Sequence, residues 1–150
     1  MELKGYDLTK AFDKYVYEFY SEGPRGKIKK HVQFQPMRNM SGNVFNLSFG
    51  DVNDITGRID DMAKSNNNDR LIVLSTVAAA VLDFTNVKPN AIILIRGSTL
   101  SRTRLYQMGI CVNLMEINEN FEIKGFIGET WELFERNRNY EGFLITRKKS

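Results

Sequence analysis

The chain has 150 residues, of which 42% are hydrophobic and 26% charged, as is ordinary for one soluble globular domain with one core. The net charge of +3 and the pI of about 9.0 permit a polyanionic partner without requiring one. The single cysteine, Cys111, excludes an intramolecular disulfide and favours a reducing compartment.

No targeting or membrane-spanning segment is predicted. The first residues lack the apolar stretch of a signal peptide. The longest apolar run, residues 71–82, is shorter than a bilayer span. We therefore expect a cytoplasmic protein that does not contact a membrane.

The first half of the chain is predicted to form strands. Residues 15–20 are aromatic and β-branched, residues 21–26 are turn formers, and residues 27–34 alternate, which together indicate an antiparallel hairpin. Residues 43–49 place Phe45, Leu47 and Phe49 on one face of a further strand. After a turn, residues 58–60 return as a short strand.

The second half adds helices. Residues 65–69 can cap a helix over residues 71–84, which is apolar on nearly every side and is therefore expected to be central. An interior strand at 91–95 follows, and then Leu105, Met108, Val112 and Met115 recur at helical spacing.

The remaining segments are short. We predict a turn at 118–120 and strands at 121–126 and 142–146, whereas residues 131–136 fit either a helix or a loop. This order of elements predicts a single α+β domain over residues 1–150, with a largely antiparallel sheet and two main helices packed on it.

The main candidate site is a cationic turn at residues 96–104, here called the arginine turn. A strand breaks at Gly97, and hydroxyls follow where a helix should begin; free backbone N–H groups at a helix start bind anions. The predicted ligand-binding residues here are Arg96, Gly97, Ser98, Thr99 and Ser101. Arg102 and Arg104 are predicted to complete a bidentate clamp on phosphate and to stabilise a transition state. The alternative is a capped helix whose arginines pair with surface carboxylates.

A second candidate is the basic hairpin, whose ligand-binding residues are Lys29 and Lys30. Such a hairpin can follow a nucleic-acid backbone, and the alternative is a solvated strand face or a protected sheet edge. His31 is the only histidine and Tyr106 lies one helical turn after Arg102, so these two are the candidate proton carriers.

No metal site and no cofactor are predicted. The oxygen-rich segment 51–61 fails the EF-hand pattern, because Thr56 and Met62 stand at its sixth and twelfth positions. A hairpin turn is the preferred interpretation, with Asp60 and Asp61 left as partners for Mg²⁺ or arginine. Trp131 and Tyr140 are either core residues or platforms for stacking bases.

Four segments carry a family signature: VYEFYSEGPRGKIK from Val16 to Lys29, N..FG from Asn46 to Gly50, TVAA.V.DFT from Thr76 to Thr85, and GST..RTRLY..GI from Gly97 to Ile110. With these segments the chain resembles a family of small, uncharacterised bacterial proteins of about this length. The resemblance implies a self-contained bacterial domain and transfers no catalytic residue.

The sequence leaves open whether the protein is an enzyme. The leading hypothesis is a protein that binds a phosphate-bearing ligand, with nucleic acid and above all RNA favoured, in its sharpest form a toxin-like ribonuclease that works without metal. The alternative is a non-catalytic interaction module, either a homodimer or the partner of a neighbouring protein.

Overall fold

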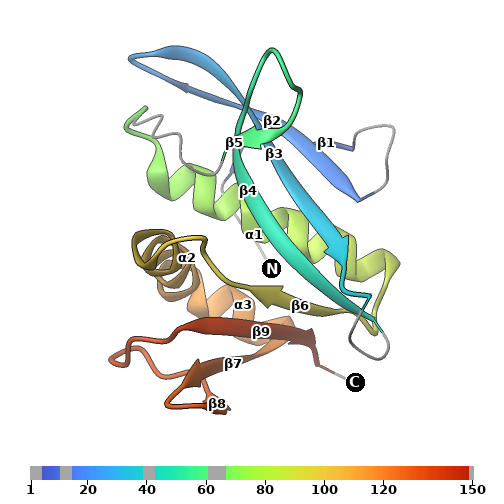
Figure 1. Ribbon diagram of the computed structural model, residues 1–150, viewed down its shortest axis with the longest axis vertical. Coiled ribbons are helices and arrows are strands. Elements are labelled where there is room, and N and C mark those ends of the chain that lie inside the picture. Colours follow the sequence, from blue (N-terminus) through green and yellow to red (C-terminus); the bar gives the residue numbers. More distant parts are fainter. Residues whose placement is uncertain (1–4, 11–14, 39–42, 61–66, 149–150) are drawn as a thin grey trace.

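A computed structural model of the chain describes residues 5–10, 15–38, 43–60 and 67–148, which form one open sheet with helices packed on it (Figure 1). The strands are β1 (Thr9–Lys10), β2 (Val16–Gly23), β3 (Gly26–Pro36), β4 (Val44–Val52), β5 (Ile59–Asp60), β6 (Ile92–Ile95), β7 (Phe121–Ile127), β8 (Thr130–Leu133) and β9 (Gly142–Arg147). The helices are α1 (Arg70–Val87), α2 (Leu100–Val112) and α3 (Leu114–Asn120).

The sheet is almost entirely antiparallel. Its order is β1-β2-β3-β4-β6-β9-β7-β8, and β5 pairs with the far end of β4. The exception is the parallel pair β4 and β6, whose connection contains α1, because parallel neighbours need a long crossover. The expected, largely antiparallel sheet is confirmed, and in Figure 1 β3 and β4 run diagonally in front of α1, with β6, β9, β7 and β8 below them.

The helices cover one face of the sheet. Phe84 of α1 stacks on Phe34 of β3, with ring centroids 4.1 Å apart, and meets Phe45 of β4 edge-on at 5.0 Å. Tyr106 of α2 meets Phe49 of β4 edge-on at 5.2 Å. Since these phenylalanines point to the same side, α1 and α2 share it, and no helix of the described residues covers the opposite side, here called the open face.

The structure differs from the sequence expectation in several elements. Three helices are present among the described residues rather than two, and residues 118–120 end α3 instead of forming a turn. Residues 130–133 form edge strand β8, where a helix or loop was expected, because they pair with β7. The helix α1 is central but covered on one side only, since Leu71 and Ile72 at its start are exposed.

Part of the expected cap of α1, residues 65 and 66, lies outside the described residues. Asp69 precedes the helix, but its side chain makes no capping hydrogen bond. Its carboxylate accepts instead from the hydroxyls of Tyr6 and Ser21, which tie the start of α1 to the N-terminal segment and to β2.

Among the described residues, one helix, α1, is long and apolar enough to cross a membrane. Half of it is buried within the fold, and a buried core helix of a soluble protein has the same length and composition. The finding is therefore weak evidence for a membrane span.

Candidate functional site

The open face is lined by polar side chains from β2, β3 and β4. In β3, Lys30, Val32 and Phe34 are buried toward the helices, so alternation sends Lys29, His31, Gln33 and Gln35 to the open face. In β4, Phe45, Leu47 and Phe49 are buried in the same way, and Asn46 and Ser48 point outward.

These polar residues form cross-strand pairs over a hollow. Gln33 lies opposite Ser48, and Gln35 lies opposite Asn46. The β4–β5 loop borders them, and together they enclose a concavity of about 630 Å³. Its lining residues are Val16, His31, Gln33, Gln35, Asn46, Ser48, Gly57, Arg58 and Ile59.

The polar lining of the concavity has unused hydrogen-bonding capacity. Within the described residues, the side chains of Gln33, Gln35, Asn46 and Ser48 form no hydrogen bond with another protein group, and Arg58 forms no ion pair. Each amide offers two donors and an acceptor with two lone pairs. A polar ligand can therefore bind here without breaking protein hydrogen bonds.

At one end of the concavity, a histidine and a glutamate form a pair. Glu18 lies directly opposite His31 on β2, and its Oε1 is 3.1 Å from His31 Nε2. Lys29 Nζ lies 3.7 Å from the same oxygen. His31 therefore has the carboxylate neighbour that a proton carrier requires.

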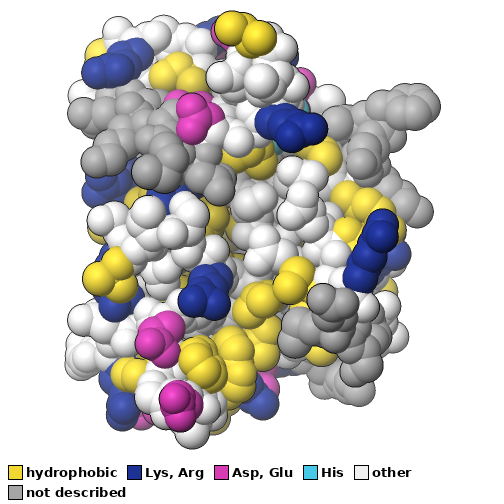
Figure 2. Space-filling model, viewed as in Figure 1, with side chains coloured by type: hydrophobic (Ala, Val, Ile, Leu, Met, Phe, Trp, Pro, Cys, Tyr) yellow, Lys and Arg dark blue, Asp and Glu magenta, His cyan; other side chains and the backbone are white. Residues whose placement is uncertain are grey.

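The open face continues across β6, β9, β7 and β8. Arg96 follows β6, and alternation places it on the open face together with Ile92 and Leu94. It lies next to Gly142 of β9, because a Cβ built on Gly142 would stand 3.9 Å from the Cβ of Arg96. Phe126 of β7 lies between Gly142 of β9 and Trp131 of β8 and pairs with both. The ring centroids of Phe126 and Trp131 lie 5.0 Å apart. Figure 2 shows a band of uncharged polar surface beside a diagonal strip of hydrophobic side chains.

The arginine turn is closed by its own hydrogen bonds. Thr99 is the N-cap of α2 and accepts from the backbone N–H of Arg102 at 3.2 Å. The hydroxyl of Thr103 accepts from the N–H of Gly97 at 3.1 Å and donates to the carbonyl of Thr99. A Cβ on Gly97 would lie 2.4 Å from the nitrogen of Thr103, so the space beside Gly97 is filled.

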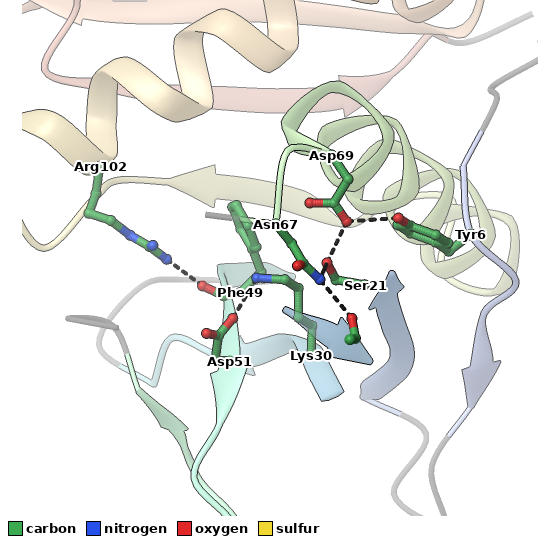
Figure 3. Close-up of polar contacts among 9 residues, drawn as sticks. Tyr6, Ser21, Lys30, Phe49, Asp51, Asn67, Asp69 and Arg102 are labelled. Carbon is green, nitrogen blue, oxygen red and sulfur yellow. Dashed lines mark hydrogen bonds and ion pairs between the residues drawn. The ribbon is translucent and has the colours of Figure 1, made fainter. Parts of the chain in front are cut away.

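Two of the three arginines in the turn bind backbone carbonyls. Arg102 Nη2 donates to the carbonyl of Phe49 at 2.5 Å, and its guanidinium lies 5.2 Å from the centre of the Phe49 ring (Figure 3). This carbonyl lies on β4 between the stretches paired with β6 and with β5. Arg104 Nη1 donates to the carbonyl of Tyr140 at 2.8 Å and so holds the segment before β9.

Among the described residues, neither arginine pairs with a surface carboxylate, which was the structural alternative for the turn, and each uses part of its guanidinium to bind a backbone carbonyl. Ser98 and Ser101 are exposed at the start of α2. Arg96 is the arginine of the turn that reaches the open face.

The two lysines of the basic hairpin separate. Lys29 is on the open face, whereas the buried Lys30 points toward the helices and pairs with Asp51, Nζ to Oδ1 2.5 Å (Figure 3). In the same buried layer, Asn67 donates to the carbonyl of Gly26 and accepts from the N–H of Arg25, which fixes the β2–β3 turn. Lys30 therefore serves the fold and is not part of the open face.

The aromatic candidates also lie apart. Tyr106 is buried against Phe49 and lines an apolar cavity of about 50 Å³ between the helices and the sheet. Tyr140 is fully buried, donates to Glu132 and accepts from the N–H of Glu135, and burial raises its pKa. Trp131 is 41% exposed on the edge strand β8.

Of the sequence candidates, His31, Lys29 and Arg96 therefore lie on the open face. It leaves Arg102, Arg104, Lys30 and Tyr106 in internal contacts. Sequence reasoning did not single out Glu18, Gln33, Gln35, Asn46, Ser48 and Arg58. The pattern that could have identified most of them is the alternation of polar and apolar residues in 27–34 and 43–49. The apolar positions predicted the core, and the polar positions could have predicted the site.

The described residues contain no group of three or more His, Cys, Asp or Glu side chains placed to hold a metal ion. Asp60 lies on β5, opposite Asp51 of β4. Asp61 lies outside the described residues.

Fold and site together define a mixed α/β protein with helices on one face of a mostly antiparallel sheet and a polar concavity on the other. The chain belongs to DUF6934, a family of unknown function, which matches over residues 2–148. No protein of curated function and no solved structure matches the chain.

Proposed function

We propose that this protein binds a phosphate-bearing ligand on the open face of its sheet, and that the ligand is single-stranded nucleic acid, with RNA favoured. The observation that carries the proposal is the concavity of about 630 Å³ whose amide and hydroxyl side chains make no hydrogen bond within the described chain. Base edges suit such groups, because asparagine and glutamine pair bidentately with adenine.

The choice of a single strand follows from accessibility. In a duplex the base edges used for pairing are occupied, whereas an unpaired strand presents them to amides such as those of Gln33 and Asn46. Arg58 lines the concavity beside these amides, and Lys29 and Arg96 lie elsewhere on the same face, where they can neutralise backbone phosphates. Trp131 provides an exposed ring for base stacking.

The test is fluorescence anisotropy with one labelled sequence prepared as single-stranded RNA, single-stranded DNA and duplex RNA. We expect single-stranded RNA to bind most tightly and the double variant Gln33→Ala/Asn46→Ala to weaken it at least about tenfold, since each amide–base pair contributes roughly 1–3 kcal/mol. The control is Asn86→Ala, an exposed amide on α1. No binding of single-stranded RNA at low salt, or equal weakening by the control, overturns the proposal.

A second candidate function, the interaction module, rests on the helix layer. Met108 and Val112 are one turn apart on α2 and exposed, and Met115 of α3 is 78% exposed. Leu71, also exposed, lies one turn before Ser75, whose hydroxyl bonds to Asn113 between α2 and α3. A homodimer through these residues is expected to dissociate in Met108→Lys/Val112→Lys, as measured by sedimentation velocity.

A further inference from the structure

The pair of His31 and Glu18 is placed for acid–base chemistry rather than for binding alone. The two side chains are largely buried, 18% and 29% exposed, and lie in register on adjacent strands with Nε2 3.1 Å from Oε1. A carboxylate on one imidazole nitrogen fixes the tautomer, so the other nitrogen, Nδ1, is left with a lone pair that accepts protons. The ring lines the same concavity as Arg58.

Two cations complete the arrangement. Lys29 Nζ stands 3.7 Å from the Glu18 oxygen that holds His31. Arg58 has no ion-pair partner among the described residues, and its guanidinium presents several N–H donors to an anion in the concavity. A base and an anion-binding group therefore line one hollow, and an ammonium acid stands beside the Glu18 carboxylate at its end.

We propose that the open face cleaves RNA, an inference that rests on the proposed function and extends it from binding to catalysis. His31 Nδ1 takes the proton of a ribose 2′-hydroxyl, and the 2′ oxygen forms a bond to the adjacent phosphorus. The bond from phosphorus to the 5′ oxygen breaks, and that oxygen leaves with a proton from the Lys29 ammonium group. The products are a 2′,3′-cyclic phosphate and a 5′-hydroxyl end. His31 then returns its proton to Lys29 through solvent, which restores both groups.

The remaining groups have separate roles. Arg58 donates to the phosphate oxygens as negative charge gathers on them, the kind of contribution that most strongly lowers such barriers. Glu18 is a positioning residue, because it acts through His31 and not on the substrate. DNA lacks the 2′-hydroxyl, so it binds on this face without being cleaved.

The substrate for the test is a labelled DNA oligonucleotide with a single ribonucleotide, and its control has a 2′-O-methyl group at that position. Wild-type protein, kept in EDTA, is expected to cut the first oligonucleotide at the ribonucleotide only and to leave the control intact. The variant His31→Gln is expected to lower the rate at least about 100-fold, and Glu18→Gln to lower kcat with little change in KM. Arg70→Ala, an exposed arginine on α1, is purified identically and should retain full activity.

Binding of fully 2′-O-methylated RNA is measured in parallel by anisotropy. If the wild type binds this RNA but leaves the ribonucleotide intact, the cleavage proposal is overturned and the binding proposal stands. If it does not bind, the proposed function itself fails. Cleavage that persists in His31→Gln overturns the assignment of the base. A rate lost in His31→Gln with unchanged binding and thermal midpoint supports it.

Discussion

The arginine turn and the open face use polar side chains in opposite ways. In the turn, Thr99, Thr103, Arg102 and Arg104 all bond to backbone groups of this chain. On the open face, Gln33, Gln35, Asn46 and Ser48 bond to none within the described residues. The denser cluster of charge is thus the one that holds the fold together, and the less charged surface is the one left available to a ligand.

The difference shows why charge density alone is a poor guide to a binding site. A guanidinium has five donors and reaches far, so it is well suited to satisfy carbonyls that a sheet leaves unpaired. The carbonyl of Phe49 falls where β4 passes from one neighbour to another. Availability of donors and acceptors, which depends on packing, distinguishes the two regions better than their charge.

The largest expected effect is that of Gly97→Ala, which tests whether the turn is closed. The added methyl would stand 2.4 Å from the nitrogen of Thr103, so the start of α2 must shift. We expect a loss of about 3 kcal/mol in the free energy of unfolding, the upper end for overpacking. The matched control is Gly142→Ala beside the open face, where the nearest atom is 3.4 Å away and the change should stay below about 0.5 kcal/mol. Equal urea midpoints for the two variants would contradict the comparison.

Next in size is Arg102→Ala, which removes the guanidinium from the carbonyl and ring of Phe49. A lost hydrogen bond to a charged group costs about 1.5–3 kcal/mol, so we expect about 2 kcal/mol by urea unfolding. Binding of single-stranded RNA by the folded variant should be nearly unchanged. The reverse outcome, normal stability with lost binding, would return the anion site to the arginine turn.

Much of the fold could be predicted from the sequence because strand alternation and helix periodicity record burial directly. The hairpin, the strand around Phe45–Phe49 and the helix over residues 71–84 all appear near their expected bounds. The edge strand β8 could not be predicted, because Trp131 and Leu133 are exposed and only pairing with β7 defines their conformation.

The site was less predictable, since it depends on which neighbours each polar group meets. Lys30 breaks the expected polar–apolar alternation, yet it occupies an inward position and is neutralised by Asp51 from the next strand. Glu18 stands opposite His31 only because of the hairpin register. Such pairings between strands are not encoded in the spacing of residues along one segment.

A smaller effect is expected from Arg58→Ala on the open face. The variant should remain within about 0.5 kcal/mol of the wild type in stability, because its guanidinium makes no ion pair with a described residue. Its binding of single-stranded RNA should depend less on salt, with the slope of log K against log salt reduced by about 0.7 for one lost phosphate contact. Anisotropy titrations at four salt concentrations measure the slope, with Arg70→Ala as the charge-matched control. An unchanged slope would remove Arg58 from the binding surface.

The smallest expected effect is on stability in acid. It distinguishes the arginine turn and the open face from a third contact, the hydrogen bond between Tyr17 and Asp83. Arg102 bonds to a carbonyl and not to a carboxylate, so wild type and Arg102→Ala should lose stability in parallel on acidification. Asp83 of α1 differs, because the hydroxyl of Tyr17, 2.6 Å away, and the nearby Lys10 lower the pKa of its carboxyl below the ordinary value. The stabilisation that this lowered pKa provides is complete above the unfolded pKa of about 3.9. This stabilisation is lost as the pH falls through the lower pKa of the folded state.

Tyr17→Phe should therefore show a flatter decline of the urea midpoint below about pH 4.5 than the wild type. The difference should be small, because the carboxylate is 46% exposed and solvent weakens its interactions. Parallel curves for Tyr17→Phe and the wild type would mean that other carboxylates account for the acid sensitivity.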